Sequence, residues 1–183
     1  MSSPTKNAVE QFNSIVSLCK KIFISKTKDY GTSWTNLRRE SLTDQIFIKA
    51  KRIRTIEETK EQKVSDSVEN EYRGILNYCI IALMQRVRNS YEYVELDEIK
   101  VTSLYEDQLK LIKELMVAKN HDYGEAWREM RVKSITDQIL QKLIRIRKIE
   151  MNDEHTINSE GIEANYQDIV NYCIFALIKL KEK

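Results

Sequence analysis

Apolar residues recur three or four positions apart along most of the chain, the spacing that gathers side chains on one face of an α-helix. This pattern marks one helix near the start of each half of the chain, through Phe12, Ile15, Val16, Cys19, Ile22 and Phe23 and through Tyr105, Leu109, Ile112, Leu115 and Met116. Gly31 and Gly124 follow these helices and predict left-handed C-terminal caps.

Two further helices are predicted in each half. The motifs Ser41-Leu-Thr-Asp44 and Ser134-Ile-Thr-Asp137 are typical of helix N-caps with an acid at the third helical position. The second helices then end near Glu57 and Glu150. Polar loops at 58–67 and 151–161 lead into third helices that end near Arg88 and Lys181.

The two halves are copies of one another. Residues 26–57 and 119–150 are identical at 17 of 32 positions at an offset of 93, and residues 68–84 and 162–178 at 9 of 17 positions at an offset of 94. The sequence therefore divides into a flexible N-terminus at 1–6, copy 1 at 7–88, a connector at 89–100 and copy 2 at 101–183. Three short helices bury little core alone, so we expect an all-α protein with both copies in one pseudo-twofold bundle.

Composition narrows the class of protein further. Apolar residues make up 42 % of the chain, while four Gly and one Pro are too few for a loop-rich fold. The 30 basic and 28 acidic residues nearly balance, which argues against a cationic nucleic-acid coat. Lys51, Arg54, Arg147 and Lys148 are accordingly interpreted as a solvated helix face.

The longest apolar runs, 78–84 and 172–178, are far shorter than the roughly 20 residues that cross a bilayer. The N-terminus also lacks the apolar core of a secretion signal. We therefore expect a soluble, cytoplasmic protein. Cys79 and Cys173 fall within apolar helical runs and are expected to be small core residues.

Cations fall on the apolar stripe of the second helix in both copies. Lys142 lies between the directions of Ile146 and Ile149, with Arg145 at the edge of the stripe, and Lys49 and Arg52 repeat this arrangement. An unpaired buried charge is very costly. These cations therefore either form internal salt bridges, or bind a phosphate or carboxylate at the bottom of a cleft.

Other repeated polar and aromatic residues leave two interpretations open. Asp29 and Asp122 lie at the C-terminal end of the first helix, where the helix dipole disfavours an anion, so a cation or a metal is expected beside them. The aromatic pairs Trp34/Trp127 and Tyr30/Tyr123 are either core residues or surfaces for base stacking. In the third helix, Glu69 and Glu163 complement the dipole or bind metal, and Asn77 and Asn171 bond across the pseudo-twofold or contact a ligand.

These residues together resemble nucleotide modification associated domain 1, a bacterial and phage family that often occurs duplicated. The matching residues are Asp29-Tyr30-Gly31, Trp34, Lys49, Arg52-Ile53, Glu69 and Asn77-Tyr78 in copy 1, and Asp122-Tyr123-Gly124, Trp127, Lys142, Arg145-Ile146, Glu163, Asp168 and Asn171-Tyr172 in copy 2. The resemblance covers nearly the whole chain. It implies a role in modified-nucleotide metabolism without establishing a reaction.

A weaker resemblance links the chain to the all-α, MazG-like nucleoside triphosphate pyrophosphohydrolases, which hold Mg²⁺ on an E-x-x-E pair followed by an E-x-x-D pair. Copy 1 offers Glu58-x-x-Glu61 and Glu71-x-x-Gly74, and copy 2 offers Glu150-x-x-Asp153 and Asn165-x-x-Asp168. Each copy keeps the acid that the other has lost. One composite site between the copies would therefore be possible.

Two hypotheses follow from these resemblances. In the first, the chain is a Mg²⁺-dependent nucleotide pyrophosphohydrolase. Glu71 and Asp168, with Glu69 and Glu163, then bind the metal, and the basic residues Lys49, Arg52, Lys142 and Arg145 neutralise the phosphates. In the second, the chain is a non-catalytic nucleotide-binding or scaffold module whose basic residues form internal ion pairs. A small-molecule nucleotide is the expected partner in both, and a homodimer that buries more of the third helices stays open.

Overall fold

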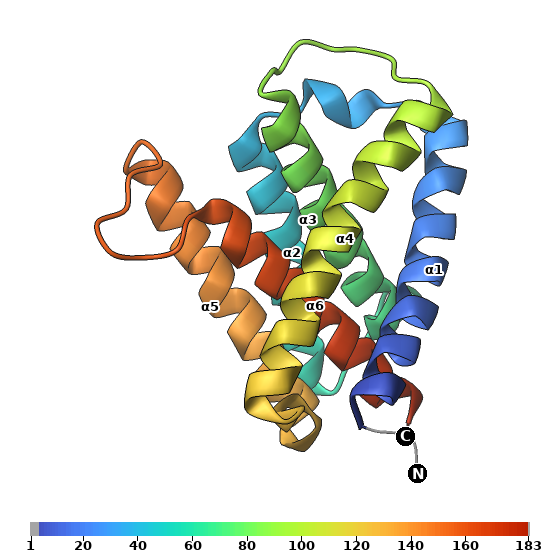
Figure 1. The fold of residues 1–183 in the computed structure, drawn as a ribbon, viewed down its shortest axis with the longest axis vertical. Coiled ribbons are helices and arrows are strands. Elements are labelled where there is room, and N and C mark those ends of the chain that lie inside the picture. The colour runs from blue at the N-terminus through green and yellow to red at the C-terminus, as the bar shows by residue number, and fades with distance from the viewer. Residues whose placement is uncertain (1–3, 183) are drawn as a thin grey trace.

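A computed structural model describes residues 4–182, which form six α-helices, two short 3₁₀ helices and no strand (Figure 1). The α-helices are α1 (Pro4–Tyr30), α2 (Arg39–Thr59), α3 (Val68–Arg88), α4 (Glu98–Tyr123), α5 (Val132–Met151) and α6 (Ile162–Lys181). The 3₁₀ helices η1 (Ser33–Asn36) and η2 (Ala126–Glu129) follow α1 and α4. The all-α prediction, with three helices in each copy, is therefore confirmed.

Two helices begin earlier than the sequence pattern predicts. α1 starts at Pro4, inside the segment 1–6 that was expected to be flexible, while residues 1–3 lie outside the described part of the chain. α4 starts at Glu98, inside the expected connector 89–100, because Asp97 caps it by accepting a hydrogen bond from the Lys100 backbone. The predicted left-handed caps are confirmed, since φ is +63° at Gly31 and +59° at Gly124.

The predicted N-caps of α2 and α5 are wrong. These helices begin at Arg39 and Val132, two residues before Ser41 and Ser134, so both serines lie within the first turn. The aspartates of the two motifs, Asp44 and Asp137, lie inside the helices and contact cations of the other copy. Asp44 lies 3.5 Å from Arg147, and Asp137 lies 3.7 Å from Arg54. The motif therefore serves contacts between copies rather than the start of its own helix.

The two copies bury their apolar faces against each other. α2 packs on α5, α3 packs on α6, and α1 contacts α4 (Figure 1). The second helices contribute Leu42, Ile46, Ile53, Ile139 and Ile146 to the core, all fully buried. Cys79 and Cys173 are also fully buried, as predicted, and burial raises the pKa of each thiol. One core shared by both copies explains why the duplicated unit forms a single bundle.

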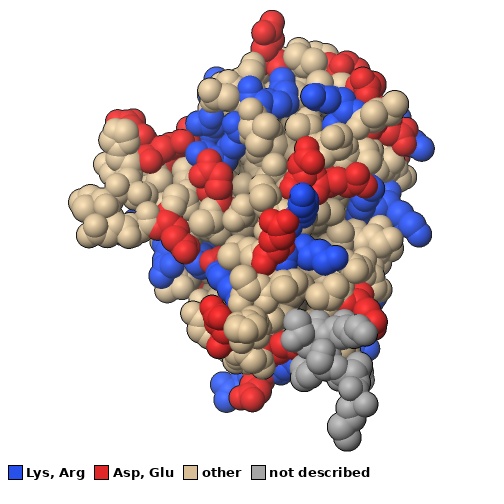
Figure 2. Space-filling model, in the orientation of Figure 1, with Lys and Arg blue, Asp and Glu red and all other residues tan. Residues whose placement is uncertain are grey.

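The surface carries mixed charge. In the view of Figure 2, Lys and Arg side chains alternate with Asp and Glu, and neither sign covers a continuous area. This pattern agrees with the formal net charge of +2. No described helix is long and apolar enough to span a membrane.

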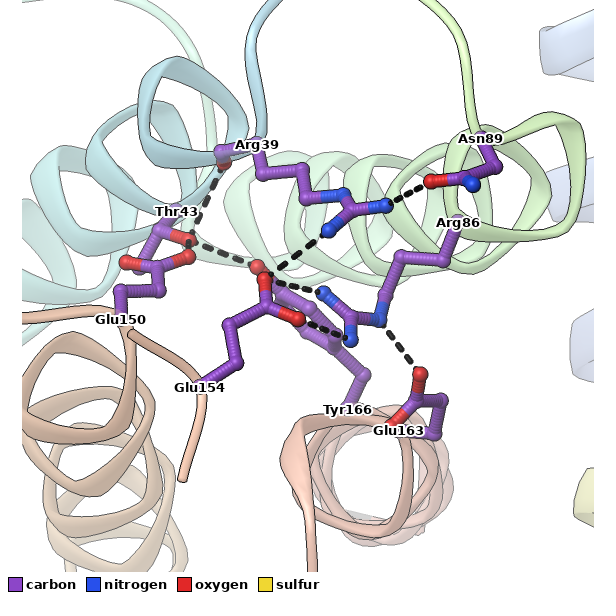
Figure 3. Close-up of polar contacts among 8 residues, drawn as sticks. All are labelled: Arg39, Thr43, Arg86, Asn89, Glu150, Glu154, Glu163 and Tyr166. Carbon is purple, nitrogen blue, oxygen red and sulfur yellow. Dashed lines mark hydrogen bonds and ion pairs between the residues drawn. The ribbon is translucent and has the colours of Figure 1, made fainter. Parts of the chain in front are cut away.

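A hydrogen-bonded relay joins the copies twice. The Thr43 hydroxyl lies 2.7 Å from the Tyr166 hydroxyl and donates to Glu150 at 2.6 Å (Figure 3). The same three positions recur with the copies exchanged: Thr136 lies 2.7 Å from the Tyr72 hydroxyl and donates to Glu57 at 2.9 Å. Each threonine near the start of its helix thus meets the far end of the antiparallel second helix of the other copy. The relays fix the register of α2 against α5.

Removing one threonine is predicted to leave two polar groups, one buried and one half-buried, without their partner. Thr136→Val takes the hydroxyl from both Tyr72 and Glu57, so we expect a loss of about 1–3 kcal/mol in the free energy of unfolding. Thr55→Val is the matched control, because the exposed Thr55 hydroxyl bonds only a carbonyl of its own helix. Urea denaturation measures both variants, and equal losses would contradict the relay.

Protonation of the relay carboxyls is predicted to stabilise the fold. Burial raises the pKa of Glu57 and Glu150 above the usual 4.5, so the native state holds protons that the unfolded chain has released. The contribution of these groups is therefore most favourable below pH 4.5 and is lost as the pH rises through the raised pKa. Glu57→Gln keeps the acceptor oxygen but cannot ionise. Its stability should decline less than that of the wild type over this pH range, and parallel urea-denaturation profiles would exclude the effect.

Candidate functional site

The inward lysine of each second helix has a buried carboxylate beside it. In copy 1, Glu71 accepts from Lys49 at 3.2 Å and from Arg52 at 2.5 Å. In copy 2, Asp168 accepts from Lys142 at 2.6 Å and from Lys119 at 2.5 Å. The side chains of Lys142 and Asp168 are only 11 % and 8 % exposed, so this pair lies deepest. The internal salt-bridge interpretation of Lys49, Arg52 and Lys142 matches this geometry.

The acid stands at a different position in each copy. The repeat counterpart of Glu71 is Asn165, and the counterpart of Asp168 is Gly74, one helical turn away. A Cβ at Gly74 would lie 3.2 Å from Cδ and Cε of Lys49, so the glycine leaves room for the lysine stem. In copy 1, Glu71 therefore pairs with Lys49 and Arg52 of the second helix. In copy 2, Asp168 pairs with Lys142 of the second helix and with Lys119 of α4.

As a consequence, Arg145 is not paired like its counterpart Arg52. Asn165, which replaces the acid in copy 2, carries no charge, and Arg145 makes no hydrogen bond or ion pair within residues 4–182. Its side chain is exposed. The four cations that the sequence placed together thus divide into three paired residues and one unpaired residue.

Cavities lie at equivalent places in the two copies. The copy 2 cavity, about 500 Å³, lies among α4, η2, α5 and α6 and includes Lys119, Lys142 and Asp168. The copy 1 aromatic cavity, about 350 Å³, includes Tyr30 and Trp34. Apart from Gly31, every residue lining the copy 1 aromatic cavity has its repeat counterpart in the copy 2 cavity. The duplication has therefore preserved this hollow in both copies.

The polar part of the hollow is separate in copy 1. A second space of about 450 Å³, the copy 1 polar cavity, includes Lys49, Glu71 and Gly74 and shares Lys26 and Tyr78 with the aromatic cavity. In copy 2 the aromatic residues and the ion-paired residues line a single cavity. Copy 2 therefore offers one continuous space where copy 1 offers two.

Aromatic side chains form one wall of the copy 2 cavity. Trp127 stacks on Phe175 with ring centroids 4.3 Å apart, lies 4.3 Å from the Arg128 guanidinium and is 6 % exposed. Tyr172 meets Phe175 edge to face at 6.5 Å. Trp127 is therefore a packed core residue, and so is Trp34 at 7 % exposure, while Tyr123 and Tyr30 are 72 % and 73 % exposed. The tyrosines rather than the tryptophans have a free ring surface.

Two buried polar atoms beside the copy 2 cavity have no partner. They are the indole Nε1 of Trp127 and the amide Oδ1 of Asn171. In copy 1, Oδ1 of Asn77 accepts from the Tyr105 hydroxyl of α4 at 2.7 Å, but the repeat counterpart of Tyr105 is Phe12. Buried polar groups nearly always find a partner in protein or water, so an unfilled donor and acceptor beside a cavity favour a ligand.

Of the two interpretations of Asn77 and Asn171, the hydrogen bond across the pseudo-twofold applies to one asparagine only. Asn77 makes this bond with Tyr105, and its amide also donates to the Cys19 carbonyl at 3.1 Å. Asn171 instead donates to the Ile112 carbonyl of its own copy at 3.3 Å. That interpretation is therefore correct for Asn77 and wrong for Asn171.

The repeated aspartates lie away from the ion-paired clusters. Asp29 and Asp122 are exposed on the last turns of α1 and α4. Asp122 contacts only His121, at 3.0 Å, and Asp29 has no hydrogen bond or ion pair in the described chain. Neither the expected cation partner nor an acidic cluster lies beside them. We find no structural account of their repetition.

The acids considered as metal ligands are dispersed. Glu163 bonds Arg86 at 2.6 Å, and Glu69 lies in the first turn of α3 without an ion pair. Glu71 and Asp168 are held by different cations. No group of three His, Cys, Asp or Glu side chains within residues 4–182 is placed to hold a metal. The Mg²⁺ site stays a prediction.

The sequence reasoning missed Lys119, which is the second cation on Asp168. Burial acts to lower the pKa of Lys119, but the hydrogen bond to Asp168 and the nearby Glu160 outweigh it and raise the pKa. Lys119 and its counterpart Lys26 are identical in the two copies and open the repeated segment, so the repeat itself pointed to this position. Phe175 was missed as a cavity residue because its counterpart is Ile81.

The fold and the paired cavities define a duplicated all-α protein with hollows at equivalent places in its two copies. The model of nucleotide modification associated domain 1 matches the chain twice, over residues 26–86 and 119–180, once within each copy. The chain therefore belongs to the nucleotide modification associated domain 1 family as a tandem duplicate. No curated protein and no solved structure matches it significantly.

The two buried carboxylates are predicted to differ in their contribution to stability. Asp168→Asn leaves the nearly buried Lys142 without its counter-charge, and breaking such a pair costs about 3–5 kcal/mol. Glu71→Gln should cost less, because Lys49 and Arg52 are 29 % and 24 % exposed and reach water. Urea denaturation of the two variants decides this, and a larger loss for Glu71→Gln would refute the ranking.

Proposed function

We propose that this protein binds a nucleotide in the copy 2 cavity. The observation that carries the proposal is the continuity of this cavity. Aromatic side chains and the Lys119–Asp168–Lys142 cluster line one space of about 500 Å³, and two of its lining residues each carry a buried polar atom without a partner. A volume of this size lies within the range of small-molecule sites. The family description, which associates the domain with nucleotide modification, supports the same class of ligand.

The chemistry of the wall fits a nucleobase. The edges of bases carry hydrogen-bond donors beside acceptors. The unfilled N–H of Trp127 and the unfilled carbonyl oxygen of Asn171 complement such an edge. The ring of Tyr123 is 72 % exposed beside the same cavity and offers a face for stacking. Base recognition would thus use one orphaned donor, one orphaned acceptor and one free aromatic ring.

A binding module is favoured over the metal-dependent hydrolase. Mg²⁺ needs carboxylate oxygens that are free to coordinate it, whereas both oxygens of Asp168 and both oxygens of Glu71 already accept from cations. A metal would have to displace these cations from buried positions. Hydrolysis of nucleoside triphosphates with Mg²⁺ remains the prediction of the sequence resemblance, and release of monophosphate in the same samples tests it.

The test is a titration of nucleosides and of nucleoside mono- and triphosphates, with canonical and modified bases, by calorimetry and thermal shift. Tyr123→Ala is predicted to weaken binding by about 1–3 kcal/mol, because a stacked ring is lost. Tyr30→Ala is the matched control, since Tyr30 is the equally exposed counterpart in copy 1. Both side chains are mostly exposed, so neither change should unfold the protein.

Two results would overturn the proposal. One is the absence of heat and of any thermal shift with every nucleoside and nucleotide in a folded sample. The other is binding that Tyr30→Ala weakens and Tyr123→Ala leaves unchanged, which would place the ligand in copy 1.

A further inference from the structure

A second hollow adjoins the copy 2 cavity. This loop cavity, about 780 Å³, lies between the end of α5, the loop 152–161 and the start of α6. The basic side chains that line it are Arg145, Lys148 and His155, and its only acid is Glu160. Glu160 also lines the copy 2 cavity, so the two spaces meet at this residue.

The cations of the loop cavity have no carboxylate partner. Neither Arg145 nor Lys148 makes an ion pair or a side-chain hydrogen bond within residues 4–182. In copy 1, the counterpart Arg52 is held by Glu71 at 2.5 Å and also donates to the carbonyls of Val64 and Asp66. Arg52 is therefore held by contacts within copy 1, whereas Arg145 is available to bind an external anion.

Neutral polar groups complete the cavity. Asn165 stands where copy 1 has Glu71, is 3 % exposed and leaves its Oδ1 without a partner, while its amide donates to the Gly161 carbonyl at 2.8 Å. This oxygen can accept only from a donor such as a sugar hydroxyl. Thr156, Asn158 and Ser159 add further polar side chains to the wall. The lining thus combines two unpaired cations with an acceptor suited to a hydroxyl.

One arginine of copy 1 clamps both ends of the loop that forms this wall. Arg86 binds Glu154 through two nitrogens, at 3.0 and 2.9 Å, and binds Glu163 at 2.6 Å (Figure 3). Arg39 adds a third contact to Glu154, at 3.1 Å. The hydrogen bonds to Arg86, followed by its charge and that of Arg39, outweigh burial and lower the pKa of Glu154. Both ends of this loop are therefore held by residues of copy 1.

The backbone at the clamp supports this interpretation. Asp153 and Glu154 have φ of +50° and +61°, a left-handed conformation that is unfavourable for residues with a side chain. Such strain persists only where neighbouring contacts hold it, and the Arg86 and Arg39 pairs supply those contacts. The copy 1 loop has no equivalent clamp, because the counterpart of Arg86 is Leu180.

We propose that the loop cavity binds the phosphate of a nucleotide, with Arg145 and Lys148 as its charged ligands. This rests on the proposed function for the base but extends it, because it makes a phosphorylated nucleotide, rather than a nucleoside, the ligand. It also makes the site single, since Arg52 is already neutralised in copy 1. The phosphate lies in the loop cavity and the base in the copy 2 cavity, on either side of Glu160.

The experiment uses inorganic pyrophosphate as a probe of the loop cavity alone, beside a nucleoside and its 5′-monophosphate and 5′-triphosphate. Arg145→Gln and Lys148→Gln are each expected to weaken pyrophosphate and nucleotide binding about tenfold or more, with little change for the nucleoside. Lys51→Gln is the control, because Lys51 is an exposed, unpaired cation of α2 and its loss changes the net charge equally. Calorimetry at two salt concentrations should show weaker pyrophosphate binding at the higher one.

The outcomes separate this inference from the proposed function. Equal affinity for the nucleoside and its phosphates, or pyrophosphate binding that Arg145→Gln does not weaken, would overturn the phosphate site while leaving the base site standing. Pyrophosphate binding that depends on Arg145, in a protein that binds no nucleoside or nucleotide, would support an anion site and refute nucleotide binding. Absence of pyrophosphate binding together with an unchanged nucleotide affinity in Lys148→Gln would also reject the phosphate site.

Discussion

The antiparallel contact of α2 with α5 is the constraint on which the rest of the structure depends. Two Tyr–Thr–Glu relays, one on each side of the pseudo-twofold, fix the register of these helices. Because each relay takes its threonine from one copy and its tyrosine and glutamate from the other, neither copy satisfies these buried groups alone. The relay therefore couples the folding of the copies, and the third helices meet across the same axis.

The two copies differ in the position of one acidic residue on the third helix. Glu71 and Asp168 stand one helical turn apart in the repeat, yet both meet the lysine of the second helix. The shift leaves Gly74 under Lys49 in copy 1 and removes the acid beside Arg145 in copy 2. Each copy keeps one acid beside the inward lysine of its second helix, and the position of that acid decides which other cation is neutralised.

The loop before α6 adds a second asymmetry. Arg86 lies at the end of α3 and binds both Glu154 and Glu163, so copy 1 holds a segment of copy 2 in place (Figure 3). Copy 2 cannot do the same, because Leu180 replaces the arginine. Copy 2 thus contains the loop cavity, and copy 1 holds the loop that forms its wall. Two equivalent sites would require each copy to contain such a cavity and also to hold the loop of the other copy.

The sequence by itself determined the duplication, the six helices, the inward cations and the family resemblance, because these follow from local periodicity and from identities at a fixed offset. Only the tertiary structure decided which carboxylate meets which cation, since Lys119 and Asp168 are 49 positions apart in the chain. It also decided that Ser41 and Ser134 are no caps, and that Asn171 and Trp127 keep an unfilled atom beside a cavity. These outcomes depend on contacts between helices that are distant in the sequence, and no pattern within one helix encodes the distance between two helices.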